Sequence, residues 1–408
     1  MLKTTQLAFG AGGVALVAGA GLAAAASGPV LALSGTALAV AALLPLVVGA
    51  SGAIVLHRLD RVERGEADLF LESNLPRREA ALDRPDGFRA GALRRTMARA
   101  MLGHDFLVGD EVEIKSLEEI QATLDERGCV GGIPFMPEMV RFAGRRGRVF
   151  RSVDKIYDYG RTRGMRQLPG CVLVSGLRCD GEPHGGCQAQ CYVIWRTEWL
   201  RKPGEARGAT GSRAIAPAEV PAVAPDGTPR QRYFCQYTEL HHASTPMGPW
   251  GIGKELRPLV AGNVTLKTWL VGLGTRLFNQ VQGLRRGAGF PARPRVKGLP
   301  AIEPEKLVPG DKVVVRPIIE IEGTLNDKGK HRGLWFDPDQ IKHCGKPRTV
   351  IARVDKIIDD AYGQMLTMKT PCILLDEVDY SGETLSFSAQ HDLYFWREHW
   401  LTKGPQAR

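Results

Sequence analysis

Cysteine is sparse in this chain, with eight residues among 408. That density is unlike a small secreted protein stapled by disulfides, so it excludes this class and favours a reducing compartment. Three of the eight stand within thirteen residues of one another, between Cys179 and Cys191, together with a histidine. In a large protein, such clustering favours metal coordination over crosslinking.

Charge is missing from residues 4 to 56, which contain no acidic or basic side chain. The stretch is about twice as long as one membrane-spanning helix requires, and Ser27-Gly-Pro29 divides it. Two spans, at roughly 7–26 and 35–56, predict a helical hairpin whose glycines allow close packing and dimerisation. A cleaved signal peptide is the competing interpretation, because a lysine, an apolar run and small residues follow one another at the N-terminus.

Basic residues follow this stretch immediately, at Arg58, Arg61 and Arg64. The positive-inside rule then places everything downstream in the cytoplasm, which predicts a bacterial inner-membrane protein with its soluble repeats facing the cytoplasm. The net charge of +10 suits phosphate-bearing partners. The predicted partners are the lipid bilayer with its anionic headgroups, unidentified proteins, and a second copy of the chain through the hairpin. Nucleic acid is the less favoured partner.

An internal duplication organises the rest of the chain. Placing residue n against residue n+201 aligns Gly109–Lys202 with Gly310–Lys403 without a gap. Each copy opens on Gly-Asp-x-Val with apolar residues at every second position, which is the period of a half-buried strand. Each copy closes on Trp-Arg-x-x-Trp-Leu, whose two tryptophans are expected in the core. Short strands between Gly, Pro and Asp turns predict an SH3-like barrel for each copy.

The predicted fold class is a mainly β soluble part, made of two tandem SH3-like barrel repeats, with an N-terminal transmembrane helical hairpin and some amphipathic helix. Apolar residues at helical spacing predict that helix over Leu266–Leu284, lying in the membrane interface or packing on a barrel. Along the chain we expect the transmembrane hairpin (1–57), a juxtamembrane basic helical segment (58–105), the first repeat with its metal site (106–203), a flexible linker (204–229), an insert with the amphipathic helix (230–300) and the second repeat (301–408).

The first copy carries the candidate metal ligands Cys179, His184, Cys187 and Cys191. The aligned positions of the second copy hold Tyr380, Leu385, Ser388 and Asp392, so all four ligands are exchanged together. Three thiolates and one imidazole fill a tetrahedral zinc shell without an open position, so a zinc ion here would be structural. A [2Fe–2S] cluster is the alternative cofactor, because Cys-Asp-Gly before a nearby histidine is similar to the CDGSH type of cluster protein. A redox thiol pair or no metal at all are the remaining alternatives.

Three motifs carry a resemblance over residues 109 to 403: Cys-Asp-Gly-x-x-His-Gly-Gly-Cys-Gln-Ala-x-Cys from Cys179, Pro134–Met139, and Gly333–Asp337 followed by Trp-Arg-Glu-x-Trp-Leu. In these motifs the chain resembles a widespread family of uncharacterised bacterial two-repeat proteins. The resemblance implies no activity. This sequence departs from the family where the second copy usually keeps cysteines of its own.

No nucleophile–base pair and no nucleotide-binding fingerprint stands out in the sequence. We therefore predict a membrane-tethered, metal-containing scaffold or accessory protein that acts on the cytoplasmic face and is not catalytic. An iron–sulfur electron-transfer or oxidoreductase component is the alternative. A nucleic-acid-binding protein that uses basic SH3-like barrels is the second alternative, and it would bind with steep salt dependence.

Overall fold

The computed structural model describes residues 92–223, 227, 229–248, 252–286, 301–376, 378, 387–390 and 392–404. The chain divides into two compact units. Met1–Ala67 and Leu270–Phe290 form one unit, of which residues 270–286 are described. Asp68–Trp269 and Pro291–Arg408 form the other unit, which contains both repeats and the candidate site.

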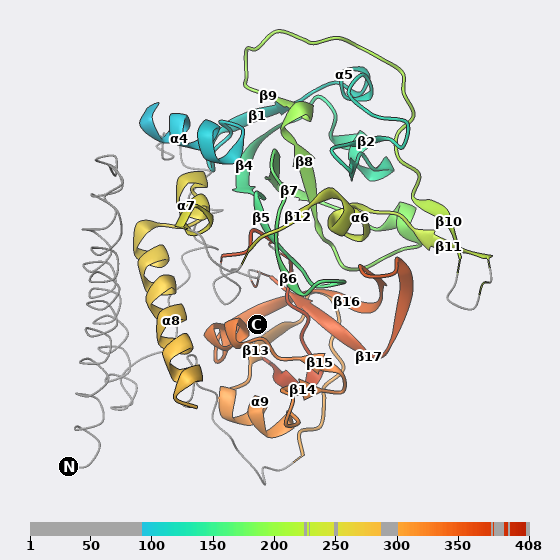
Figure 1. Ribbon diagram of the computed structural model, residues 1–408. Coiled ribbons are helices and arrows are strands. Elements are labelled where there is room, and N and C mark those ends of the chain that lie inside the picture. The colour runs from blue at the N-terminus through green and yellow to red at the C-terminus, as the bar shows by residue number, and fades with distance from the viewer. Residues whose placement is uncertain are drawn as a thin grey trace, which may run out of the picture. The chain divides into compact units, whose positions relative to one another are not determined.

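The first repeat is built on a five-stranded antiparallel sheet in the order β8-β7-β4-β1-β9 (Figure 1). Its strands are β1 (Glu111–Ile114), β4 (Arg146–Ser152), β7 (Cys171–Arg178), β8 (Tyr192–Arg196) and β9 (Leu200–Arg201). The shorter elements are α5 (Leu117–Gln121), β2 (Cys129–Val130), β3 (Ile133–Pro134), η1 (Pro137–Phe142), β5 (Lys155–Asp158), β6 (Gly164–Gln167), η2 (Glu182–His184) and η3 (Thr197–Trp199).

The sequence explains the local order of this repeat. Helix α5 begins after Ser116, whose hydroxyl accepts the Glu119 N–H while the Glu119 carboxylate accepts the Ser116 N–H, a reciprocal cap. The core forms around Trp195 and Trp199, both without exposed surface. Phe135 meets them edge-on at ring-centre distances of 6.4 and 5.3 Å, so the conspicuous tryptophans of the repeat lie in its core.

The second repeat has most of these elements at the same offset, but a single bridge between Ile373 and Trp396 stands in place of strand β8. Its strands β13 (Lys312–Val315), β16 (Pro347–Asp359), β17 (Gln364–Leu375) and β18 (Leu401–Lys403) form a sheet in the order β17-β16-β13-β18. Its shorter elements are α9 (Ile318–Thr324), β14 (Lys330–His331), β15 (Leu334–Trp335), η4 (Pro338–His343) and η5 (Glu398–Trp400). Phe336 again meets two buried tryptophans edge-on, at 6.2 and 5.1 Å. The duplication in the sequence is therefore a duplication of structure.

The two repeats contact each other through equivalent residues. The Gln188 N–H donates to the Lys356 carbonyl at 3.1 Å, and the Ala389 N–H donates to the Lys155 carbonyl at 2.9 Å. Gln188 and Ala389 are equivalent positions of the two copies, as are Lys155 and Lys356. We use the term reciprocal contact for these two hydrogen bonds together with two more, which Cys187 and Ser388 accept from the other repeat.

The second pair involves side-chain acceptors. The Cys187 sulfur accepts the Ile358 N–H at 3.4 Å, and the Ser388 hydroxyl oxygen accepts the Tyr157 N–H at 3.1 Å. Cys187 and Ser388 are again equivalent, as are Tyr157 and Ile358. The repeats thus meet as two subunits of an isologous dimer do, with one surface used twice.

The segment between the repeats is ordered along the first repeat. Strands β10 (Glu219–Val223) and β11 (Pro229–Tyr233) pair as a hairpin, and the Gly211 N–H donates to the Glu118 carbonyl at 2.8 Å. Ala216 is fully buried and its N–H donates to the Phe135 carbonyl. These contacts differ from the flexible linker that the composition of 204–229 predicts. Small residues can leave a chain flexible, but they can also pack closely against a neighbouring element.

The insert contributes helices and one short strand. Helix α6 (Gln236–Ala243) packs beside β3, and β12 (Thr245–Pro246) pairs with β6. Helix α7 (Ile252–Ala261) packs against α4 (Ala92–Leu102), where the Arg94 guanidinium donates to the Val260 carbonyl at 2.8 Å. Helix α8 spans Leu266–Leu284, which are the residues that the apolar stripe indicates.

The predicted fold class is wrong in two respects. The described residues form a mixture of antiparallel sheets, half-barrels and helices instead of two closed SH3-like barrels, because the strand order of each main sheet does not close on itself. Over the same residues, no helix is long and apolar enough to cross a membrane. The predicted hairpin of residues 1–57 lies outside the described part of the chain.

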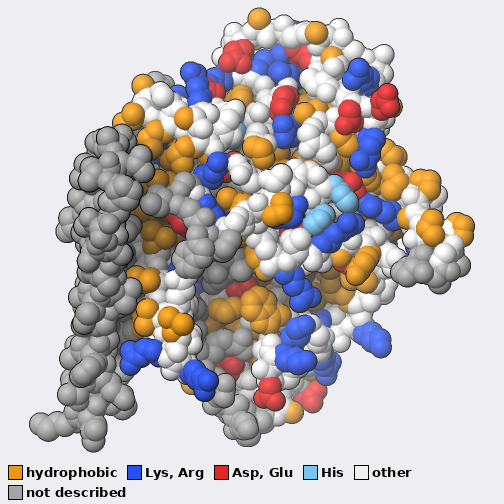
Figure 2. Space-filling view, in the orientation of Figure 1, with side chains coloured by type: hydrophobic (Ala, Val, Ile, Leu, Met, Phe, Trp, Pro, Cys, Tyr) orange, Lys and Arg blue, Asp and Glu red, His pale blue; other side chains and the backbone are white. Residues whose placement is uncertain are grey.

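The predicted membrane location is also corrected. Helix α8, the described helix with the longest apolar stripe, does not qualify as a membrane span, so the predicted inner-membrane location is unsupported. On the face shown in Figure 2, lysine and arginine side chains are interspersed with acidic and apolar ones. That face therefore presents no single basic patch.

Candidate metal centre

A glycine-rich loop joins β7 to β8 and carries the predicted ligands. Gly181, Gly185 and Gly186 all have positive φ angles, of 72°, 64° and 72°, which L-residues other than glycine adopt at a cost. At Gly181 space is also lacking, since a Cβ atom there would lie 1.8 Å from the Cys187 carbonyl oxygen. The loop therefore closes on itself tightly enough to bring residues at its two ends together.

Backbone hydrogen bonds fix this closure. The Cys179 N–H donates to the Cys191 carbonyl at 2.9 Å, which joins the two ends of the loop. Within the loop, the N–H groups of His184 and Gly186 both donate to the Gly181 carbonyl, at 3.0 and 2.9 Å. The thiols and the imidazole are thus held by the backbone itself.

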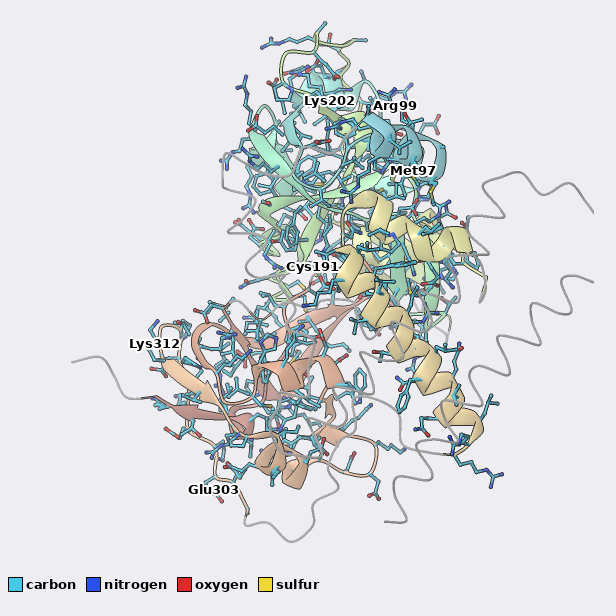
Figure 3. All side chains as sticks on the ribbon, turned by 90° about the vertical axis from the view of Figure 1, so that its left-hand side faces the viewer. Met97, Arg99, Cys191, Lys202, Glu303 and Lys312 are labelled. Atoms are coloured by element: carbon cyan, nitrogen blue, oxygen red, sulfur yellow. The ribbon has the colours of Figure 1, made fainter. Side chains whose placement is uncertain are left out.

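One cavity of about 40 Å³ collects all four predicted ligand residues. Cys179, His184, Cys187 and Cys191 line it together. In Figure 3, Cys191 lies where the strands of the first repeat approach those of the second. Three further side chains with a carboxylate or a thiol line the same cavity, Glu138 from η1, Cys235 at the start of α6 and Asp360 after β16.

Glu138, Cys179 and His184 form the tightest group in the cavity. Their donor atoms lie within 4.8 Å of one another, and His184 Nε2 is 3.0 Å from Glu138 Oε1. Both side chains are almost fully buried. Within the described residues, the other ring nitrogen, His184 Nδ1, is buried without a hydrogen-bond partner. An orphaned buried nitrogen beside several thiols fits a site that holds a thiophilic metal.

Backbone N–H groups point at the sulfur atoms. The Gly181 N–H donates to Cys179 Sγ at 3.3 Å, and the Ile358 N–H donates to Cys187 Sγ at 3.4 Å. At Cys235, hydrogen bonds from the backbone of Thr238 and Tyr237 favour the thiolate. Such donors stabilise negative charge on sulfur, which is the form that binds metals.

Three of the cavity thiols have raised pKa values, which favours their protonated form when no metal is bound. Burial, and next the nearby Glu138 carboxylate, raise the pKa of Cys179 far above its ordinary value. Burial and then Asp392 raise the pKa of Cys191 strongly, and burial with Asp360 raises the pKa of Cys235 to about 12. A nucleophilic cysteine needs a lowered pKa, so none of these three thiols suits that role.

Acidic side chains of the second repeat complete the surroundings. Burial raises the pKa of Asp360 to about 7, with a further contribution from Asp392. The Tyr237 hydroxyl reaches Asp392 Oδ1 at 3.5 Å and donates to the Tyr192 carbonyl at 3.2 Å. The cavity is therefore enclosed by the first repeat, the insert and the second repeat together.

The sequence interpretation selects the four loop residues but misses Glu138, Cys235 and Asp360. All three are distant from the loop in sequence, so no local spacing connects them to it. Cys235 carries one signal that could have pointed to it, because it stands directly before a helix, where a thiolate is stabilised. In the second copy, the described counterparts Ser388 and Asp392 face the first repeat and α6, while Tyr380 and Leu385 lie outside the described residues.

No family model matches the chain, and no curated protein matches it significantly. The resemblance to the two-repeat family therefore stays a prediction.

Proposed function

We propose that the protein is a non-catalytic scaffold whose first repeat binds a metal ion at its junction with the second repeat, with zinc as the first candidate. One observation carries this proposal: the four residues selected by spacing line a single cavity that the second repeat helps to enclose. The predicted ligands are the thiolates of Cys179, Cys187 and Cys191 and the imidazole of His184. A metal with four protein ligands stabilises the folded state and has no open position for a substrate.

The loop that would hold the metal is also the loop that contacts the second repeat. The Gln188 side chain accepts the N–H groups of Asp355 and Lys356, at 2.7 and 3.1 Å. The Lys356 ammonium donates to the Gly185 carbonyl at 2.7 Å. Fixing the loop therefore fixes the orientation of the repeats, and two rigidly joined repeats offer protein partners a composite surface.

Elemental analysis of the purified full chain tests this proposal. We expect one equivalent of zinc per chain, and its removal by a chelator should increase hydrogen exchange in β16 around Lys356 as well as in the loop. The second repeat provides the internal control, because strand β13 lies away from the cavity residues and should exchange at an unchanged rate. Protein that is purified with neither zinc nor iron, and that binds neither metal when supplied, would contradict the proposal.

A second candidate function is electron transfer by an iron–sulfur cluster, and the spacing of the sulfur atoms favours it. A single zinc ion with Zn–S bonds of about 2.3 Å holds its sulfurs roughly 3.8 Å apart. Among the described residues, the one group of three candidate ligands within 4.8 Å is Glu138, Cys179 and His184, which contains a single sulfur. Wider sulfur spacing suits a polynuclear centre. Visible absorption that bleaches on reduction would support the cluster, and colourless protein that contains zinc would exclude it.

A further inference from the structure

We propose that Cys235 is the fourth ligand of the metal centre in place of His184, so that four thiolates, from Cys179, Cys187, Cys191 and Cys235, bind the metal. This inference rests on the proposed metal centre and concerns which side chains compose it. It assigns a ligand to the insert, outside the loop that the sequence motif defines.

Cys235 is placed for coordination by its position before α6. It is the N-terminal cap of that eight-residue helix, where the positive end of the helix dipole and free backbone N–H groups favour a thiolate. Cys235 lines the same cavity as the three loop cysteines, and it lies near enough to Cys179 to influence that thiol electrostatically. Cys179 and Cys187 receive backbone N–H groups in the same way.

The next residue holds Cys235 in place. The Gln236 side chain pairs with the backbone of Ile194 in β8, accepting its N–H at 2.7 Å and donating to its carbonyl at 2.8 Å. It also donates to the Pro134 carbonyl at 3.1 Å. Since β8 begins directly after Cys191, these bonds hold Cys235 at the cavity that the last loop cysteine also lines, as a preorganised ligand requires.

His184 Nε2 is already paired with Glu138, and in this assignment His184 Nδ1 faces the centre without binding the metal. Its partner Glu138 occupies, in η1, the position that Asp339 occupies in η4 of the second repeat. Asp339 forms an ion pair there with the Lys342 ammonium at 2.9 Å and accepts a hydrogen bond from the Tyr394 hydroxyl at 2.7 Å. In both repeats, a buried carboxylate at this position meets a donor from a neighbouring element. His184 therefore acts as the outer partner that orients Glu138 beside Cys179.

Zinc binding by three full-length variants tests the assignment, with Zn²⁺ as the probe in competition with a chromophoric chelator. Cys235→Ser should lower zinc affinity by more than the ~10–100-fold that an outer partner contributes, and His184→Gln should stay within that range. Cys344→Ser is the matched control, since Cys344 is also a partly buried thiol but lies outside the cavity, and its affinity should equal that of the parent. If iron is present on purification, iron content replaces zinc affinity as the readout.

A measurement on the parent protein keeps the assignment testable if Cys235→Ser does not fold. Alkylation followed by peptide mass spectrometry should show that Zn²⁺ protects Cys235 together with the three loop cysteines, while Cys344 reacts at the same rate with and without Zn²⁺. Cys235 labelling that is indifferent to Zn²⁺, or a larger loss of affinity in His184→Gln than in Cys235→Ser, would overturn this inference and leave the metal centre standing. A parent protein that binds no metal would overturn both.

Discussion

Replacing Cys187 by serine distinguishes two roles of this side chain, as a metal ligand and as a hydrogen-bond acceptor. Cys187 Sγ accepts the Ile358 N–H at 3.4 Å. At the equivalent place in the reciprocal contact, the Ser388 hydroxyl accepts the Tyr157 N–H at 3.1 Å. The protein therefore already uses serine for this contact, so Cys187→Ser should keep the hydrogen bond between the repeats while removing a thiolate from the cavity.

The expected effect differs with and without metal. In chelator, the exchange of one acceptor for another should change the stability of the first repeat by about 1 kcal/mol or less. With saturating Zn²⁺, loss of one ligand should weaken binding by about 100-fold or more, the upper end of what even an outer partner contributes. Because each tenfold change corresponds to about 1.4 kcal/mol, Zn²⁺ should stabilise the variant by about 2.7 kcal/mol less than the parent.

Native-state hydrogen exchange of β7 and β8 measures this difference locally, which matters because a chain of several parts need not unfold in one step. Ser388→Ala is the matched control: it removes the reciprocal acceptor and should destabilise the protein equally with and without Zn²⁺. If Cys187→Ser lowers the free energy of unfolding by the same amount in chelator as in Zn²⁺, the thiol contributes through packing and hydrogen bonding. The prediction that Cys187 is a metal ligand is then refuted.

Three further predictions concern the loop, the outer partner and the second repeat. Gly181→Ala should destabilise the loop by more than the ~1–2 kcal/mol of a left-handed alanine, because its Cβ would meet the Cys187 carbonyl; zinc content that matches the parent would contradict this. Glu138→Gln should lower zinc affinity by ~10–100-fold without abolishing binding, as a chelator titration would show. Burial, and to a smaller extent the positive charge of Lys342, lower the pKa of His343 from 6.5 to about 2. Below pH 6.5 the unfolded chain therefore binds a proton at this residue that the folded chain does not bind. Stability should then be complete above pH 6.5 and fall by about 1.4 kcal/mol per pH unit below it; exchange in η4 at pH 5.5 should show this decline in the parent and not in His343→Gln.

Local pattern predicts local structure in this chain. The strand expected where each copy opens on Gly-Asp-x-Val is observed as β1 over Glu111–Ile114 and as β13 over Lys312–Val315. The stripe at Leu266–Leu284 matches α8. Periodicity and capping act over a few residues, so the sequence displays them directly.

Long-range packing is where prediction fails. Whether a sheet closes into a barrel depends on strand edges that periodicity does not reveal, and the linker is ordered by contacts with residues far from it in sequence, such as Glu118 and Phe135. Cys235 and Asp360 join the loop cysteines only because α6 packs beside β8 and because the second repeat contacts the first. Spacing within one segment cannot contain that information.

The duplication explains how a metal centre in one repeat can stabilise the junction between the two repeats. Each repeat presents a loop position, Cys187 or Ser388, to a backbone N–H of the other repeat, and this exchange is symmetric. In the first loop, the acceptor is a thiol beside further thiols, whereas in the second it is a hydroxyl that cannot complete a thiolate-rich shell. One half of a symmetric junction can therefore be reinforced by a metal while the other relies on hydrogen bonds alone. Loss of metal should then loosen the junction from the side of Lys356 and leave the Lys155 side, with its Ala389 hydrogen bond, the slower of the two to exchange.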